Sequence, residues 1–284
     1  MSTTALKMDQ QLQNRARILV KCPDKPGIVS ALSSFLHAHN ANIIESNQYS
    51  SDPEDGMFFI RIEFHCDDLV MKRSKMEEEF KQIAAQYNMT YSFHYKAIRQ
   101  RAAIYVSKET HCLMELLWEW QNGDLDMDIA VVISNSDVAR PMVEALGIPY
   151  YYIPANKDIR EQVEAEQIRL MEEFKVDLLI LARYMQILTP NFVAHFENRI
   201  INIHHSFLPA FIGANPYARA FARGVKLIGA TSHYVTNDLD EGPIIEQDVE
   251  RVDHRDDVVA LKKIGQKIER RVLVKAVKWR LENR

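Results

Sequence analysis

Two short segments carry an amide, an imidazole and a carboxylate that could act together on a carbonyl group. Asn202 and His204 stand at the end of an apolar run, residues 199–203, and Asp240 stands in the acidic turn 237–243 (NDLDEGP). An amide and an imidazole can donate hydrogen bonds to a developing oxyanion. A carboxylate can orient a water molecule or a histidine and move a proton. If both segments open onto one crevice, the three residues can perform carbonyl chemistry without a covalent nucleophile.

Each of these residues has other interpretations. A histidine after a buried strand can be a packed structural residue, and Asp240 suits a turn of sequence DLDEGP. His204, His205, His233 and Asp240 are also acceptable metal ligands. However, adjacent strand residues point to opposite faces, and the HExxH spacing is absent. The G-x-S-x-G elbow of serine hydrolases is absent around Ser206. The G-x-G-x-x-G motif that would indicate a nicotinamide cofactor is absent as well. We therefore expect neither a metal nor a cofactor.

The elements that must position these residues follow from the pattern after residue 97. Short apolar strands alternate with amphipathic helices, with strands at 102–106, 129–134, 150–154 and 177–182 and helices from Cys112, Asp137 and Asp158. This alternation is typical of parallel βαβ units with helices on both faces of the sheet. In such sheets reactive groups collect at the carboxyl ends of strands. We expect a Rossmann-like α/β domain with a mostly parallel sheet, in which the strands at 199–203 and 229–236 are neighbours.

The first hundred residues follow a different pattern. Strand-like and helical segments come in the order β-α-β-β-α-β, at 17–22, 28–36, 42–50, 57–65, 76–87 and 91–97. This order predicts a ferredoxin-like α+β unit. We therefore place the small domain at residues 1–97, ordered from about residue 15, and the larger domain at 98–284, with a long helix after residue 256.

Composition limits the class of protein. The chain has 284 residues, of which 47% are hydrophobic and 26% charged, and its formal net charge is −4. These values are ordinary for soluble globular domains, and the acidic balance argues against a nucleic-acid partner. Three widely spaced cysteines give no disulfide framework, and the apolar runs are too short to span a membrane. We expect a cytoplasmic protein that binds neither nucleic acid nor a membrane.

Residues 199–209 (RIINIHHSFLP) and 239–243 (LDEGP) closely resemble the folate-dependent formyltransferase family, whose motifs read N-I-H-x-S-x-L-P and L-D-x-G-P. The resemblance covers roughly residues 101–280. It implies that Asn202, His204 and Asp240 are the catalytic residues. It also implies that the loop at 184–190 and the segment at 235–240 hold a pterin ring. The substrate-binding residues implied are Met185, Gln186, Ile187, Leu188, Val235, Asn237 and Asp238.

The acceptor distinguishes the branches of this family. Glycinamide ribonucleotide formyltransferases cradle the substrate phosphate in a glycine-rich loop after the first strand. Here residues 106–112 (VSKETHC) contain no glycine, Glu109 would repel an anion, and Gln186 stands where that branch commonly has arginine. Water is then the simplest acceptor, and HHSFLPAFIGANPY resembles the deformylase branch. A formyltransferase to an amine such as glycinamide ribonucleotide remains the alternative. A non-catalytic folate-binding or amino-acid-binding protein is a further one.

The turn Asp24-Lys-Pro-Gly27 between strand and helix resembles the ACT regulatory domains. An ACT-like domain fused to a formyltransferase-like domain is similar to the 10-formyltetrahydrofolate deformylases. The similarity implies hydrolysis of 10-formyltetrahydrofolate to tetrahydrofolate and formate, with the folate as substrate. The ACT resemblance implies an amino-acid effector, glycine or methionine, near Asp24, Gly27 and Asn42, or else a docking module. We expect a homo-oligomer, and His205 either faces a water channel or packs.

Overall fold

The structure, a computed structural model, describes residues 12–52, 55–154, 159–209 and 216–284. The chain divides into two compact units, Met1–Arg99 and Gln100–Arg284. The boundary in the sequence therefore lies two residues after the expected one. Part of the turn at 51–56, the first residue of the helix expected from Asp158, and residues 210–215 of the HHSFLPAFIGANPY motif lie outside the described residues.

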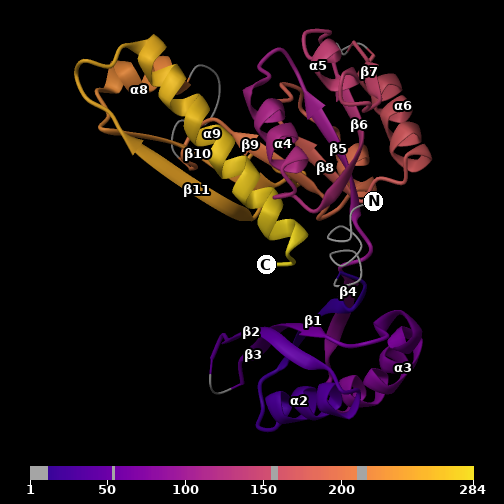
Figure 1. Ribbon diagram of the computed structural model, residues 1–284. Coiled ribbons are helices and arrows are strands. Elements are labelled where there is room, and N and C mark those ends of the chain that lie inside the picture. The colour runs from indigo at the N-terminus through magenta and orange to yellow at the C-terminus, as the bar shows by residue number, and fades with distance from the viewer. Residues whose placement is uncertain (1–11, 53–54, 155–158, 210–215) are drawn as a thin grey trace. The chain divides into compact units, whose positions relative to one another are not determined.

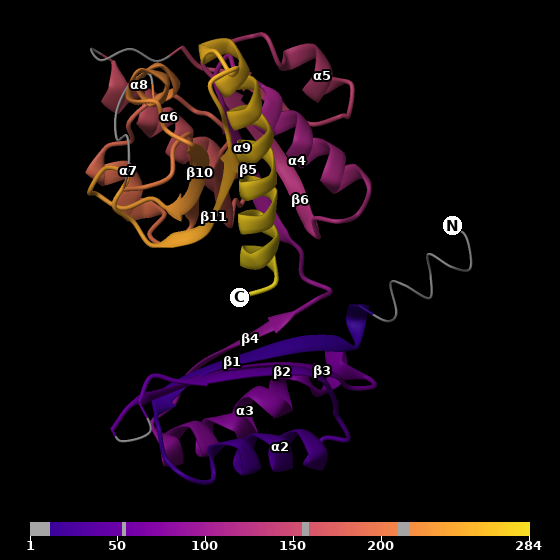
Figure 2. The same cartoon turned by 90° about the vertical axis from the view of Figure 1, so that its left-hand side faces the viewer.

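The N-terminal unit is the expected ferredoxin-like α+β fold. Its elements are β1 (Arg15–Pro23), α2 (Ile28–Ala38), β2 (Asn42–Ser50), β3 (Met57–His65), α3 (Leu69–Tyr87) and β4 (Thr90–Tyr95). The strands form one antiparallel sheet in the order β2-β3-β1-β4, and both helices cover one face of it (Figures 1 and 2). Alternate strand residues such as Ile18, Ile60 and Phe64 pack against Leu32 and Phe80 of the helices, which gives this unit its own core.

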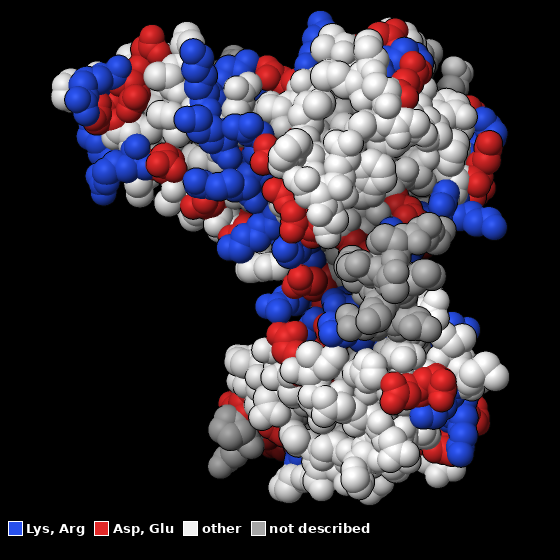
Figure 3. Space-filling model, viewed as in Figure 1, with Lys and Arg blue, Asp and Glu red and all other residues white. Residues whose placement is uncertain are grey.

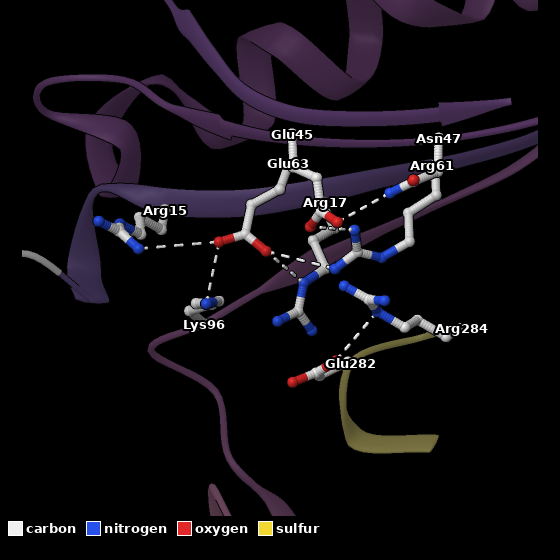
Figure 4. A network of polar contacts seen from close by, with 9 residues as sticks. All are labelled: Arg15, Arg17, Glu45, Asn47, Arg61, Glu63, Lys96, Glu282 and Arg284. Carbon is white, nitrogen blue, oxygen red and sulfur yellow. Dashed lines mark hydrogen bonds and ion pairs between the residues drawn. The ribbon is translucent and has the colours of Figure 1, made fainter. Parts of the chain in front are cut away.

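The opposite face of this sheet carries a charged network centred on Glu63 (Figure 4). Arg17 Nε donates to Glu63 Oε2 at 2.9 Å, and Lys96 Nζ lies 2.9 Å from Oε1. Arg61 joins Glu63 to Glu45. The alternation in β3 predicts that Arg61 and Glu63 face away from the apolar core, yet both are less than a tenth exposed. Burial alone would raise the pKa of Glu63, but hydrogen bonds from Arg17 and Lys96 lower it below its ordinary value.

The C-terminal unit is built on a seven-stranded sheet in the order β11-β10-β9-β8-β5-β6-β7. Its elements are β5 (Gln100–Val106), α4 (His111–Gln121), β6 (Met127–Ser134), α5 (Arg140–Glu144), β7 (Tyr150–Tyr152), α6 (Arg160–Glu173), β8 (Leu178–Leu181), α7 (Pro190–His195), β9 (Ile200–His204), α8 (Pro216–Arg223), β10 (Leu227–Tyr234), β11 (Ile244–Arg251) and α9 (Val258–Leu281). The strands from β9 to β7 are parallel, which confirms the Rossmann-like prediction.

Both faces of the central strands are buried, as their continuous apolar sequences predict. Ile104 of β5 belongs to a core that includes residues of α4 and α9, and Tyr105, the next residue, belongs to the core formed with α6 and α7. Figures 1 and 2 show these helices along the sheet. Lys and Arg gather on the solvent face of α9 (Figure 3), where Arg271 and Lys275 pair with Asp248 and Glu246 of β11. Among the described residues no helix is long and apolar enough to cross a membrane.

The two strands that carry the site end at opposite edges of the sheet. The strands β9 and β10 are neighbours, but they are antiparallel, with Asn202 opposite His233 and His204 opposite Thr231. Their carboxyl ends therefore point in opposite directions. Asp240 reaches β9 because the segment after β10 folds back, with Tyr234 N bonded to Pro243 O at 2.9 Å. The alternation of strands and helices could not predict this reversal, because the connection from β9 to β10 contains the helix α8 and resembles that of a parallel βαβ unit.

Candidate active site

The strand β9 places Asn202 and His204 on the same face, because side chains two residues apart point the same way along a strand. Both line a cavity of about 610 Å³ in the C-terminal unit, together with Asp240 and His233. His204 is 7% exposed. Its Nδ1 lies 3.2 Å from Asp240 Oδ1, and its Nε2 is buried without a hydrogen-bond partner among the described residues. One ring nitrogen is thus held by the carboxylate, and the other is available to a ligand.

His233 completes this cluster and was missed as a catalytic candidate from the sequence. It is 2% exposed, and its Nε2 lies 3.2 Å from Asn202 Nδ2 and 3.6 Å from Asp240 Oδ1. Its Nδ1 lies 3.0 Å from the carbonyl oxygen of Tyr234, an acceptor, so this nitrogen carries a hydrogen. From the sequence alone, His233 is a candidate only as a metal ligand. The antiparallel register that sets it opposite Asn202 was the missing information.

The two histidines determine the charge of Asp240. A hydrogen bond from His204 holds the pKa of Asp240 far below its ordinary value, the adjacent His233 ring adds to the shift, and burial opposes it. The carboxylate is therefore ionised throughout the physiological pH range. Asp240 has φ +60°, a left-handed backbone conformation that is uncommon outside glycine. A glycine would fit this backbone more easily, but it would lack the carboxylate.

Thr231 fixes the turn that follows β9. Its hydroxyl donates to the carbonyl oxygen of Ser206 at 3.0 Å and accepts from the Leu208 backbone N–H at 3.0 Å. Gln247 of β11 reinforces this arrangement with hydrogen bonds to Thr231 Oγ1 and to Leu208 O. The turn starts directly after His204 and His205. These bonds therefore hold the end of β9 rigid at the cavity.

The loop at 184–189 and the segment at 235–240 form another wall of the cavity. The predicted binding residues Met185, Gln186, Ile187, Leu188, Val235, Asn237 and Asp238 all line it. The side chains of Met185 and Ile187 are more than half exposed. Ser107 Oγ accepts from the Met185 N–H at 3.0 Å, and Glu164 accepts from both the N–H and the hydroxyl of Thr189. The loop is thus fixed at both ends and presents apolar side chains between them.

His205 also lines the cavity. Burial, and next the positive charge of Arg183, lower its pKa to about 4. The ring is therefore neutral near pH 7. Its centroid lies 5.3 Å from the ring of His204 and 6.2 Å from that of Tyr217. His205 thus borders the cavity and also packs beside two rings, and its role at a water channel stays a prediction.

The predicted effector residues do not come together within one chain. Gly27 begins α2 with φ +96°, and the nearby Asp24 accepts a hydrogen bond from Ser50 at 2.5 Å. These residues follow Pro23, which pairs with Met57 at one end of β3. Asn42 pairs with His65 at the other end of β3. A single small ligand could not touch Gly27 and Asn42 of the same copy, since nine strand residues span roughly 30 Å.

Metal ligation has one geometric candidate in the described part of the chain. Potential ligand atoms of His111, Cys112 and Glu269 lie within 4.8 Å of one another. Burial raises the pKa of Cys112 well above its ordinary value, so the thiol stays protonated, whereas a metal needs the thiolate. Arg183 Nε lies 3.4 Å from the Glu269 carboxylate and places a positive charge beside it. These surroundings disfavour a cation.

Comparisons with known proteins agree with this geometry. The chain matches the ACT domain family over residues 16–70 and the formyl transferase family over residues 100–277. A formyltetrahydrofolate deformylase of Bacillus subtilis (strain 168) is 64% identical over 96% of this chain and 91% of its own length. The crystal structure of a formyltetrahydrofolate deformylase from Pseudomonas syringae pv. tomato is 45% identical, with a TM-score of 0.91, and covers 95% of this chain and 90% of that one.

Amine-accepting enzymes are more distant. A glycinamide ribonucleotide transformylase of Symbiobacterium toebii is 30% identical with a TM-score of 0.62, over 66% of this chain and 89% of that one. Fold and site therefore define a formyl transferase domain preceded by an ACT domain. The similarity over nearly the whole chain is to the hydrolytic branch. The chain belongs to the formyltetrahydrofolate deformylase family, as its motifs predict.

Proposed function

We propose that this chain hydrolyses 10-formyltetrahydrofolate to tetrahydrofolate and formate. The observation that carries the proposal is the position of Asp240 Oδ1, 3.2 Å from His204 Nδ1 and 3.6 Å from His233 Nε2, in a cavity that Asn202 also lines. Membership of the deformylase family supports it. The reaction needs neither a metal nor a cofactor, because the folate is the substrate.

The pterin ring enters between the loop at 184–189 and the segment at 235–240. Backbone groups there read its polar edge, and Met185, Ile187, Leu188 and Val235 supply apolar walls. This placement directs the formyl group toward β9. The exposure of Met185 and Ile187 supports the assignment, because apolar side chains gathered at a cavity mark a ligand site.

The formyl group is attacked by water. The Asn202 amide donates to the formyl oxygen, where negative charge develops, and Nε2 of His204 takes a proton from the attacking water. Asp240 stabilises the imidazolium that results, as an ionised carboxylate behind a histidine does in other hydrolases. As the bond between the formyl carbon and the folate nitrogen breaks, His204 returns the proton to that nitrogen. Formic acid leaves and ionises to formate.

A spectrophotometric assay of the pure protein tests this function. We expect 10-formyltetrahydrofolate alone, with no amine and no cofactor added, to give tetrahydrofolate and formate in equal amounts. Tetrahydrofolate production that requires an amine such as glycinamide ribonucleotide, with the formyl group found on that amine and no formate released, would instead establish the transferase alternative. Binding of the folate without any turnover would establish a binding protein.

We infer that the ACT unit binds an amino-acid effector, glycine or methionine, near Asp24 and Gly27, and that Asn42 contributes only from a second copy. The separation of Asn42 from Gly27 along β3 supports a site shared between copies. Calorimetry with each amino acid, followed by turnover with and without it, tests this role. If neither amino acid binds and turnover is indifferent to both, the unit is a docking module.

We also propose a homo-oligomer in the cytoplasm. The edge strand β2 supports this assembly, because Ile43, Ile44 and Tyr49 are exposed there and its outer backbone edge is available for pairing. Light scattering on the purified chain measures the number of copies. A single copy at micromolar concentration would contradict the assembly, and cell fractionation tests the compartment.

A further inference from the structure

The cavity has another end that the proposed hydrolysis does not use. The residues that line this end are Arg183, His205, Tyr217 and Lys262. The strands β8 and β9 are parallel, with Leu181 beside Asn202. Two residues beyond this pair, the chain reaches Arg183 on one side and His204 on the other. Arg183 therefore stands next to the proposed catalytic histidine at the carboxyl edge of the sheet.

The guanidinium of Arg183 has donors without acceptors. The residue is 9% exposed, and its Nε and Nη1 are buried without a hydrogen-bond partner among the described residues. Buried donors of a charged group are nearly always satisfied in folded proteins. Arg183 also has φ +66°, an uncommon backbone conformation for a side chain of this size. A buried, unsatisfied guanidinium at a cavity wall indicates a ligand that supplies oxygen atoms.

Glu269 balances the charge of Arg183 without satisfying those donors. Tyr217 donates to Glu269 Oε1 at 2.5 Å, and His111 Nε2 lies 2.8 Å from Oε2. Arg183 Nε stands 3.4 Å from Oε2, which is an ion-pair distance. Lys262 is paired in the same way with Glu109, at 2.6 Å. The charges at this end are therefore paired, while Nε and Nη1 of Arg183 have no hydrogen-bond acceptor among the described residues.

We propose that Arg183 is the binding site of a small carboxylate, namely the formate product, at this end of the cavity. The inference rests on the proposed hydrolysis, which produces formate beside His204. The Nη1 group of Arg183 can donate a charge-assisted hydrogen bond to a carboxylate, and formate, a planar ion of three heavy atoms, is the smallest carboxylate that can accept it. Because Glu269 already balances the charge of Arg183, binding is weak, which suits a product that must leave.

His205 is compatible with such an anion. It lies between His204 and Tyr217 along the cavity wall, and its ring is neutral near pH 7. It can therefore donate or accept a hydrogen bond toward formate without adding charge. Formate would move from the formyl position to Arg183 past this ring, and the position beside His204 would become free for the next water molecule.

Product inhibition tests the site. Turnover is measured against sodium formate, at constant ionic strength with sodium chloride, for the wild type, Arg183→Lys and Arg183→Gln. Arg183→Lys keeps the positive charge opposite Glu269 but lacks the Nη1 group. Arg169→Lys, an exposed arginine of α6 that is paired with Glu166, is the matched control. Inhibition by tetrahydrofolate is measured in parallel, and NMR titration of labelled formate into folate-free protein gives binding without turnover.

We expect the inhibition constant for formate to rise at least about tenfold in both Arg183 variants, as loss of a charge-assisted hydrogen bond predicts. The inhibition constant for tetrahydrofolate should change less than about twofold. Both inhibition constants of Arg169→Lys should match those of the wild type. Equal formate constants in all four proteins, or no formate binding to the wild type, would overturn the site and leave the hydrolysis intact. If the wild type does not hydrolyse the folate, the proposed function fails instead, and the NMR titration still decides whether Arg183 binds formate.

Discussion

The Asp240 carboxylate lies 3.2 Å from Nδ1 of His204, and this contact joins the turn between β10 and β11 to the end of β9. The contact fixes which ring nitrogen of His204 is occupied. Nε2 is buried and has no hydrogen-bond partner among the described residues, in a side chain that lines the cavity. A histidine held in this way can take a proton from water, because the carboxylate stabilises the imidazolium that forms.

Replacement of Asp240 by asparagine tests this relationship. The amide keeps the shape of the side chain but cannot stabilise an imidazolium, so we expect turnover to fall at least about a hundredfold. His204→Ala and Asn202→Ala should each cause a loss of similar size. Turnover and thermal unfolding are measured together to separate chemistry from folding. A folded variant with a near-native rate would remove its residue from the mechanism.

His233 is predicted to support catalysis through its contacts with Asn202 and Asp240. Its replacement by phenylalanine removes the acceptor for Asn202 Nδ2 and one of the two groups that lower the pKa of Asp240. We expect kcat to fall about tenfold to a hundredfold, with a smaller change in KM, because the ring contacts Asn202 and Asp240, which act on the formyl group. His195→Phe, at an exposed histidine of α7, is the control. Equal kcat values for the two variants would show that His233 only packs.

The sequence predicts most of the fold because each element carries its own signal. The apolar strand at 178–181 and the alternation in β3 appear in the structure where the pattern places them. Asn202, His204 and Asp240 were found through their motif. Their partner His233 depends on strand register, which periodicity does not encode. The link from Tyr217 to Glu269 joins α8 to α9, and no local pattern contains such a distant contact.

His205 makes the stability of the protein depend on pH. Its pKa is about 4 in the folded chain and 6.5 without the fold. Between these values the unfolded chain binds the additional proton, so stability falls as the pH falls from 6.5 toward 4. At pH 5 the loss from this residue is about 2 kcal/mol. Denaturant unfolding at pH 7 and pH 5 should show a smaller decrease for His205→Asn than for the wild type. Equal decreases in stability for the two proteins would mean that the His205 ring protonates as freely in the folded chain as in the unfolded chain.

Glu164 is predicted to act on substrate binding through the loop that it anchors. It accepts from the Thr189 N–H at 2.8 Å and also from the Thr189 hydroxyl. Glu164→Gln retains one acceptor oxygen and loses the other, which should loosen the loop at 184–189. We expect KM for the folate to rise about tenfold while kcat changes little. Glu161→Gln, at an exposed position of the same helix, is the control, and an unchanged KM in Glu164→Gln would contradict the anchoring role.

Gly265 is predicted to leave the space on α9 that the Tyr217 ring occupies, a space that we call the notch. A Cβ atom at this position would overlap the phenol oxygen and ring of Tyr217, which donates to Glu269 one helical turn further on. Glycine within a helix costs about 1 kcal/mol relative to alanine, so Gly265→Ala would stabilise an ordinary helix. Here we expect it to lower the free energy of unfolding by about 1–3 kcal/mol, because the phenol must shift and leave the buried Glu269 carboxylate with one donor fewer. In a Tyr217→Ala background the same substitution should stabilise the protein by about 1 kcal/mol, and a stabilising effect in both backgrounds would refute the notch.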